Sequence, residues 1–194
     1  MPSKPKLKPP AGTFTDIPDE VALAFAEREK QGSTCQWIFE VDYSINSKKP
    51  RFFVFHIKTG NLYKYKTAHG RGGKNEDPHD GKCRQVSNVD GSGCSSVGAI
   101  RTLALYTSNK VGRALRLGGL SATNSNIEGR GVVLHGSDYV HDNDASTDNQ
   151  LSGRSLGCIV TDEKYIHHSA GGELLDVLAN GSIGVAHFAG KFKI

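Results

Sequence analysis

Two residues of this chain, His135 and Cys158, have the side chains that nucleophilic catalysis by a thiolate requires. His135 follows the apolar run 131–134, and Cys158 begins the apolar run 158–160, so each is predicted at one end of a buried strand. An imidazole beside a thiol can take its proton, and the resulting thiolate can attack a carbonyl carbon. The pair therefore predicts acyl-transfer chemistry through a covalent cysteine intermediate.

A glycine adjoins each of these two residues, Gly136 after the histidine and Gly157 before the cysteine. Glycine permits close backbone approach and positive φ angles. We expect the backbone amides of Gly157 and Cys158 to face a developing oxyanion. We also expect the carbonyl of Gly136 to hold the imidazole in one tautomer, a role that carboxylates fill in other triads.

The order of short motifs around these residues is specific: HG at 135–136, YV at 139–140 and GRSLGC at 153–158. This order resembles the catalytic signature of the murein L,D-transpeptidase (YkuD-like) family, in the branch with S-x-G-C rather than S-H-G-C. The resemblance covers roughly residues 35 to 185. Upstream motifs that follow the order of the same branch are Ala68–Gly72, Ser87–Asn88, Gly91–Ser92, Ser95–Gly98 and Leu115–Leu120.

The resemblance implies a substrate and a reaction. In such enzymes a cysteine attacks a murein stem tetrapeptide between the L-centre of its third residue and the terminal D-residue. An amine of a second stem then gives a 3→3 cross-link, whereas water gives L,D-carboxypeptidase activity. The implied partners are therefore peptidoglycan stem peptides, with Cys158 as nucleophile, His135 as base, and neither cofactor nor metal.

Four further residues are candidates for substrate contact. Arg154 offers a guanidinium fork for a carboxylate, although a surface salt bridge is the alternative. Tyr139 either lines the cleft or simply packs, and Ser155 fits a loop-closing hydrogen bond. His69 begins a polar, glycine-rich stretch (69–96), which is either one wall of a substrate cleft or a surface excursion.

Two positions depart from the family pattern. Leu156 stands where the commoner branch has histidine, and Ile159 stands where the nearer branch has proline after the cysteine. These differences concern the conformation of the loop and the substrate preference, and they leave the nucleophile and the base in place.

Composition predicts a single mainly β domain with one or two helices, because 23 glycines among 194 residues suit short strands joined by turns. The L,D-transpeptidase-type fold implied by the resemblance is a β-sandwich or a partly closed barrel. Residues 1–12 are predicted to be a flexible Pro/Lys tail, and residues 13–194 a single catalytic domain with an N-terminal helix at 17–31.

Apolar runs beyond the helix predict the strands. Residues 36–43, 51–57 and 62–67 read as a meander, with a hairpin signal at Thr59-Gly60-Asn61. Residues 97–106 read as a pair of strands, and residues 182–188 as an edge strand.

Net charge and hydropathy limit the classes of binding partner and the cellular location that we expect. A net charge of +4 with scattered Lys and Arg does not favour nucleic acid, and it is compatible with an anionic wall polymer. No apolar stretch is long enough to span a bilayer, and the first ten residues lack the apolar core of a signal peptide. Action on murein would place the protein in the periplasm or cell envelope, through a missing leader or a leaderless route. The oligomeric state is not predicted.

Three alternatives stay open. Cys83 and Cys94 form either a disulfide or two thiols. The domain is either an enzyme that builds or trims walls, a wall-attacking effector or phage lytic enzyme, or an inactive wall-binding module. A metal hydrolase is the remaining alternative, with ligands drawn from His135, Asp138, His141, Asp142 and Asp144.

Overall fold

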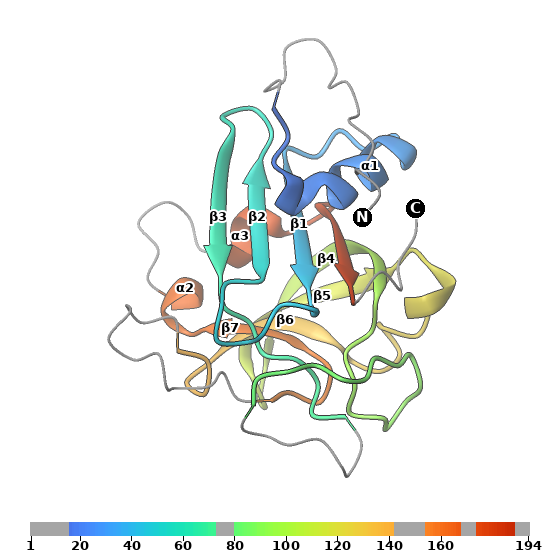
Figure 1. Cartoon of the computed structure of the whole chain (residues 1–194), viewed down its shortest axis with the longest axis vertical. Coiled ribbons are helices and arrows are strands. Elements are labelled where there is room, and N and C mark those ends of the chain that lie inside the picture. Colours follow the sequence, from blue (N-terminus) through green and yellow to red (C-terminus); the bar gives the residue numbers. More distant parts are fainter. Residues whose placement is uncertain (1–15, 73–79, 142–153, 168–173, 189–194) are drawn as a thin grey trace.

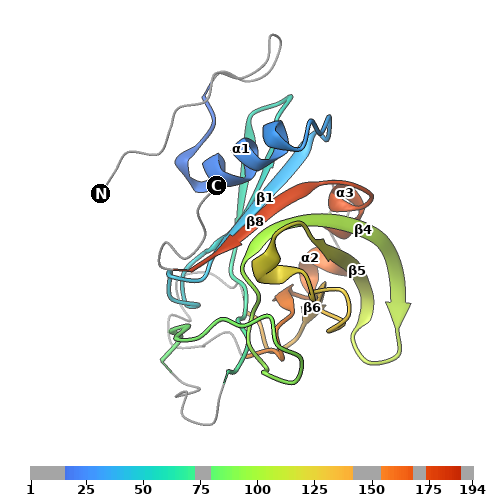
Figure 2. The same ribbon diagram turned by 90° about the vertical axis from the view of Figure 1, so that its right-hand side faces the viewer.

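The apolar runs of the chain become eight strands of one sheet, in the order β3-β2-β1-β8-β4-β5-β6-β7. The computed structural model describes residues 16–72, 80–141, 154–167 and 174–188. The sheet curves until it is nearly closed into a barrel, as Figure 1 and Figure 2 show. The predicted mainly β fold with few helices is confirmed. The strands are β1 (Trp37–Asp42), β2 (Phe52–His56), β3 (Asn61–Tyr65), β4 (Gly98–Ser108), β5 (Gly112–Gly119), β6 (Val133–Ser137), β7 (Ile159–Asp162) and β8 (Ile183–His187).

Two of the strand predictions need correction. The segment 182–188 contains β8, which is central rather than at an edge, because it pairs with β1 on one side and with β4 on the other. Ile183 and Val185 are fully buried, as two-sided packing requires. The segment 97–106 is not a strand pair but most of the single strand β4, which continues to Ser108 before it turns into β5.

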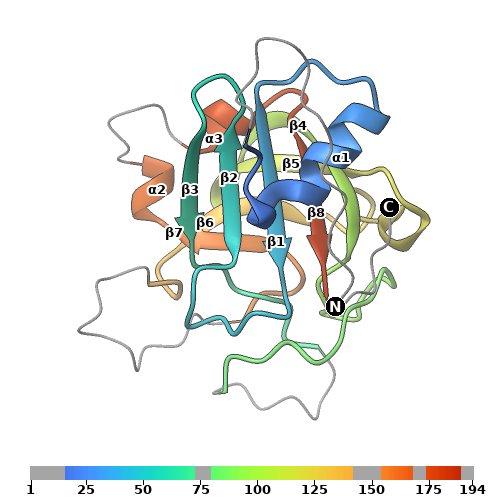
Figure 3. The ribbon, with the colours of Figure 1, turned by 45° about the horizontal axis from the view of Figure 1, so that its top comes forward.

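The predicted N-terminal helix is present, and it covers one face of the sheet (Figure 3). Phe25 packs with Val21 and Ala24 against the outer face of β1, β2 and β8. The carboxylate of Glu40 on β1 accepts hydrogen bonds from the amides of Leu23 and Ala24, at 3.0 and 3.2 Å. A buried acid thus serves as the N-terminal cap that no local side chain provides. The helical elements are η1 (Asp19–Val21), α1 (Ala22–Lys30), η2 (Ala122–Asn124), α2 (Lys164–His167) and α3 (Leu174–Leu178).

The inner face of the curved sheet holds the larger core. Its side chains come from β1, β2, β4, β5, β6 and β7, and α2 and α3 also contribute to it. Phe39 and Phe52 meet edge to face, with ring centroids 5.9 Å apart. Because β1, β2 and β8 are buried on both faces of the sheet, these strands are almost continuously apolar.

The chain that leaves edge strand β3 reaches the other edge of the sheet. Ala68 forms a bridge with Val160 of β7, and Gly70 forms one with Ser155. The hydroxyl of Thr67 donates to the carbonyl of Val160 at 2.7 Å. The two edges therefore approach each other at residues 154–160, the stretch that contains Cys158. The predicted tail at 1–12 lies outside the described residues.

Candidate active site

The register of β6 and β7 brings the two predicted catalytic residues to one place. The strands are parallel, and His135 pairs with Val160 while Leu134 pairs with Ile159. Cys158 immediately precedes β7, so its side chain and that of His135 lie on the same face of neighbouring strands. Cys158 packs against the small apolar cluster of Ala68, Val140 and Val160.

The imidazole of His135 has a defined orientation. Its Nδ1 lies 2.8 Å from the carbonyl oxygen of Gly136, so Nδ1 donates a proton and Nε2 is the basic nitrogen. This contact is the one expected from sequence. A Cβ at Gly136 would lie 2.6 Å from Cγ1 of Ile166 on α2, so the tight packing requires glycine here. Burial lowers the pKa of His135, against the opposing effect of the Gly136 carbonyl.

The thiol of Cys158 has a perturbed pKa as well. Burial raises this pKa, while a backbone hydrogen bond with Val133 and the positive charge of Arg130 lower it in part. Because the pKa of the imidazole is lowered and the pKa of the thiol is raised, both side chains are neutral at rest near neutral pH. Such a pair needs proton transfer to His135 before the sulfur becomes a strong nucleophile.

The turn that carries Cys158 is stabilised internally by Ser155. The Gly157 amide donates to Oγ of Ser155 at 3.0 Å, and that hydroxyl donates to the Cys158 carbonyl at 2.8 Å. Ser155 therefore closes the turn, as its position in the sequence suggested. Gly157 has a φ of +124°, and a Cβ there would lie 2.6 Å from the carbonyl oxygen of Cys94. Leu156 at the tip of the turn is 64 % exposed.

His69 contributes its backbone to this turn and its side chain to the interior. The amide of Ser155 donates to the His69 carbonyl at 2.9 Å. The ring is 1 % exposed, and its Nδ1 accepts from Nη2 of the fully buried Arg51 at 2.9 Å. Burial, followed by the charges of Arg51 and Arg154, lowers the pKa of His69 to about 3. The side chain of His69 therefore lies beneath the turn rather than on the surface of a cleft.

Arg154 and Tyr139, the two other predicted substrate contacts, both precede Cys158 in sequence. Nη1 of Arg154 donates to the backbone carbonyl of Arg71 at 3.1 Å. Tyr139 packs beside Cys158, and burial, followed by the Cys158 charge, raises the pKa of its phenol to about 12. A neutral tyrosine thus packs against the same small apolar cluster as Cys158, while Arg154 is tied to the backbone of Arg71.

Arg130, which the sequence reasoning did not single out, also lies at this turn. Its Nη2 donates to the Cys94 carbonyl at 2.8 Å and would lie 3.1 Å from a Cβ at Gly157. The signal in the sequence was its position directly before Gly131 and the apolar run that leads into His135. A basic residue at the start of a buried strand has to reach polar partners nearby.

Cys83 and Cys94 and the residues of the alternative metal site were the other candidates from the sequence. Cys83 and Cys94 are present as thiols, which donate to the carbonyls of Gln85 and Ser92. Within residues 16–72, 80–141, 154–167 and 174–188, no three His, Cys, Asp or Glu side chains are grouped to hold a metal ion. Asp142 and Asp144 of the alternative metal site lie outside the described residues.

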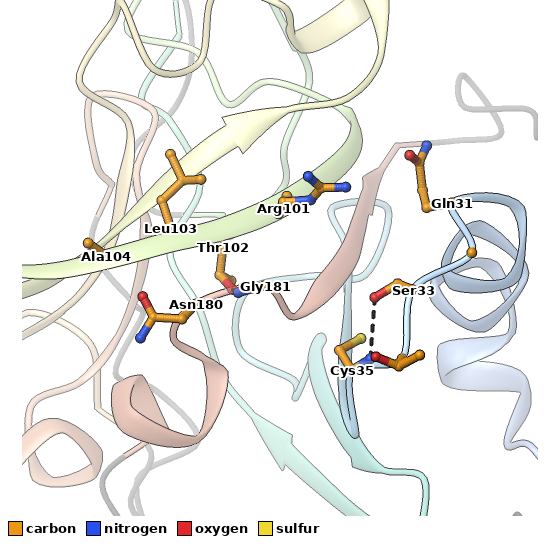
Figure 4. Close-up of a pocket in the computed structure, with 11 residues that line it drawn as sticks. Gln31, Ser33, Cys35, Arg101, Thr102, Leu103, Ala104, Asn180 and Gly181 are labelled. Carbon is orange, nitrogen blue, oxygen red and sulfur yellow. Dashed lines mark hydrogen bonds between the residues drawn. The ribbon is translucent and has the colours of Figure 1, made fainter.

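A separate groove of about 730 Å³ lies away from these residues. It runs between the end of α1, the middle of β4 and the turn before β8, and Figure 4 shows Arg101, Asn180 and Cys35 along it. None of the predicted site residues lines it. The predicted catalytic residues therefore lie at β6 and β7 and not in this groove.

Comparisons with known proteins assign the family. No curated protein matches the chain. The solved structure of Bdellovibrio bacteriovorus Bd1075 matches with 15 % identity and a TM-score of 0.42, over 78 % of this chain and 47 % of that one. This chain thus spans less than half of that protein. The L,D-transpeptidase catalytic domain family (YkuD_2) matches residues 15–186, which include every described residue of the site. The chain belongs to the L,D-transpeptidase catalytic domain family.

Proposed function

We propose that this domain is a cysteine-dependent L,D-transpeptidase that acts on peptidoglycan stem peptides, with Cys158 as nucleophile and His135 as general base. Family membership supports a peptidoglycan transpeptidase-type function. The observation that supports the finer assignment is the parallel β6–β7 register, by which Cys158 and His135 lie on the same face of neighbouring strands, with Nδ1 of His135 tied to the Gly136 carbonyl.

The reaction follows from the orientation of His135. Its Nε2 takes the proton of the Cys158 thiol, and the thiolate attacks the carbonyl carbon between the third and fourth residues of a stem tetrapeptide. The imidazolium returns that proton to the departing amine of the terminal D-residue, which leaves a thioester on Cys158. An amine of a second stem then displaces the sulfur and forms a 3→3 cross-link. Water in the same step gives the L,D-carboxypeptidase product.

The oxyanion of the tetrahedral intermediate needs backbone donors near the sulfur. We assign this role first to the Cys158 amide, because the Gly157 amide already donates to Ser155. Gly157 becomes the second donor when the Ser155 hydroxyl releases it. This assignment gives Ser155 control over how many amides face the oxyanion.

Three side chains around the turn are proposed to contact the substrate. Arg154 is the partner for the terminal carboxylate of the donor stem, because a guanidinium matches a carboxylate with two parallel hydrogen bonds. Tyr139 packs beside the sulfur and borders the donor peptide. Leu156, exposed at the tip of the turn, offers an apolar contact where the commoner branch has histidine. His69 is assigned a supporting role instead, since its ring is buried.

Activity should depend on pH through His135. Burial lowers its pKa below the ordinary value of 6.5, so the neutral, basic form persists to pH values below 6.5. Activity is therefore expected to be constant as pH falls to that value and to decline only below it.

The proposed site of action is the cell envelope, where the proposed substrate occurs. Among the described helices none is long and apolar enough to cross a membrane.

The test is mass spectrometry of the purified protein incubated with defined disaccharide-tetrapeptide muropeptides, beside Cys158→Ala and His135→Ala. We expect loss of the terminal residue or formation of cross-linked dimers with the unmodified protein, and no product with Cys158→Ala. The ratio of dimer to trimmed monomer identifies the acceptor. The covalent intermediate should add the mass of the disaccharide-tripeptide acyl group to Cys158.

Two results would change the assignment. Product formation that survives in Cys158→Ala would remove the cysteine mechanism, and full activity in His135→Ala would remove the assigned base. No product from any protein would favour an inactive wall-binding module. Lysis of intact walls in the same experiment would instead favour a wall-attacking enzyme of the same fold.

A further inference from the structure

The guanidinium of Arg130 makes four hydrogen bonds near the predicted nucleophile, and none of them is to a carboxylate. Nη1 donates to the Ser87 carbonyl at 2.8 Å and to the Ser96 hydroxyl at 2.6 Å. Nη2 donates to the Ser92 hydroxyl at 3.3 Å and to the Cys94 carbonyl at 2.8 Å. Nε is buried and has no partner. All four hydrogen bonds of Nη1 and Nη2 therefore go to one segment, residues 87–96, which we call the serine segment.

The serine segment is confined between two parts of the site. On one side, the Gly70 amide donates to the Ser95 hydroxyl at 2.9 Å, and the Gly72 amide donates to the Gly93 carbonyl at 3.1 Å. On the other side, the Cys94 carbonyl comes so close to Gly157 that a Cβ there would lie 2.6 Å away. The serine segment thus packs directly against the turn at residues 155–158 that carries Cys158.

We infer that Arg130 is a positioning residue for the nucleophile: it holds the serine segment against Gly157 and thereby fixes the turn that presents the Cys158 thiol. This inference deepens the proposed function, because it rests on Cys158 being the nucleophile. Four hydrogen bonds in a rigid fork restrain the Cys94 carbonyl more firmly than a single bond would. A displacement of the turn by about 1 Å can cost two orders of magnitude in rate.

The charge of Arg130 adds a second effect at the same place. Its side chain is half-buried and has no acidic partner among the hydrogen bonds and ion pairs of the described chain, so its positive charge is not neutralised locally. A positive charge near a thiol favours the thiolate and opposes the effect of burial. Arg130 therefore eases the proton transfer from Cys158 to His135.

The experiment measures the pH dependence of alkylation at Cys158 by iodoacetamide, read by mass spectrometry of the peptide that contains it. Arg130→Met should move the midpoint to higher pH and slow alkylation at neutral pH by roughly tenfold, since one pKa unit changes the thiolate fraction tenfold. Cys35, which is partly exposed and lies beside the groove of Figure 4, is an internal control in the same molecule. Arg101→Met is the matched variant, because it removes the same charge from an exposed position on β4.

A second variant separates charge from geometry. Arg130→Lys keeps the charge and loses most of the fork, so its alkylation midpoint should stay nearer to that of the unmodified protein while kcat on muropeptides falls and KM does not. If Arg130→Met does not fold, Arg130→Lys alone tests the inference. An alkylation midpoint and a kcat both equal to those of the unmodified protein would then overturn it. So would an Arg130→Met protein that alkylates like the Arg101→Met control.

These readouts distinguish the two proposals. Alkylation of Cys158 needs no murein, so a protein that leaves muropeptides untouched would refute the proposed function without deciding the role of Arg130. Conversely, murein activity that persists with an unchanged midpoint in Arg130→Met would refute the role of Arg130 alone.

Discussion

The two halves of the sheet are held by different kinds of contact. In the half formed by β1, β2 and β8, apolar side chains from both faces meet α1 on the outside and the core on the inside. In the half formed by β6 and β7, the site depends on backbone hydrogen bonds from the segment 67–71 and on the serine segment held by Arg130. Both halves bury apolar side chains, but the site in the second half depends in addition on contacts between loops far apart in sequence.

The difference determines what a substitution should change in each half. Loss of apolar volume under α1 should lower the free energy of unfolding and leave the rate of the folded enzyme intact. Small displacements of the loops around Cys158 should lower the rate with a smaller loss of stability. Substitutions in each half test whether stability and rate separate in this way.

The largest effect on stability is expected from Phe25→Ala. Phe25 is 1 % exposed in the cluster beneath α1, so truncation should lower the free energy of unfolding by about 3–5 kcal/mol. Chemical denaturation measures this loss, and kcat on muropeptides should be unchanged at temperatures where the variant is folded. A fall in kcat comparable to that of a site variant would show that α1 supports the site directly, and would end the distinction between the halves.

Apart from substitutions of Cys158 and His135 themselves, the largest effect on activity without a comparable loss of stability is expected from Gly157→Ala. The methyl group would lie 2.6 Å from the Cys94 carbonyl oxygen, and the φ of +124° is unfavourable for alanine, so the turn must shift. We expect kcat to fall by about 100-fold, the cost of a displacement of roughly 1 Å. Steady-state kinetics on a muropeptide measure it.

Gly112→Ala is the matched control for that variant. Gly112 also has a positive φ, of +69°, but nothing lies within 4 Å of a Cβ there, at the start of β5. It should cost about 1 kcal/mol of stability and leave kcat unchanged. Equal kinetic losses in both variants would mean that backbone strain, rather than contact with the serine segment, limits the site.

The same contrast explains what could be predicted from the sequence. The helix at 17–31 and the strands β1, β2 and β3 follow from periodicity and turn residues, which act locally. The central position of β8 could not be read locally, because an apolar run has the same composition at an edge and in the centre. His135 and Cys158 were found because each ends or begins an apolar run within a specific order of motifs.

The supporting residues were harder to predict, because their roles depend on partners distant in sequence. Arg130 acts through Ser87 and Cys94, and His69 acts through Arg51. A polar residue in a loop has the same local pattern whether its side chain faces solvent or the interior, so the ring of His69 was predicted at a cleft surface. Burial of that ring under the turn is a property of the assembled barrel.

The buried His69 predicts a dependence of stability on pH that links the two halves, since Arg51 on the first holds it beneath the turn of the second. The pKa of His69 is about 3 in the folded protein and 6.5 ordinarily, so between these values the unfolded chain binds a proton that the folded protein does not. Stability should therefore fall as pH drops from 6.5 toward 3, by at most about 1.4 kcal/mol per pH unit from this residue.

His69→Gln, which keeps an acceptor for Arg51, should show a shallower decline in denaturation midpoint between pH 6.5 and 4.5. His56→Gln, at the partly exposed end of β2, should retain most of the decline, because burial lowers the pKa of His56 as well but less than that of the fully buried His69. A decline as steep in His69→Gln as in the unmodified protein would place the acid sensitivity elsewhere, with His135 as the next residue to test because burial lowers its pKa in the same direction.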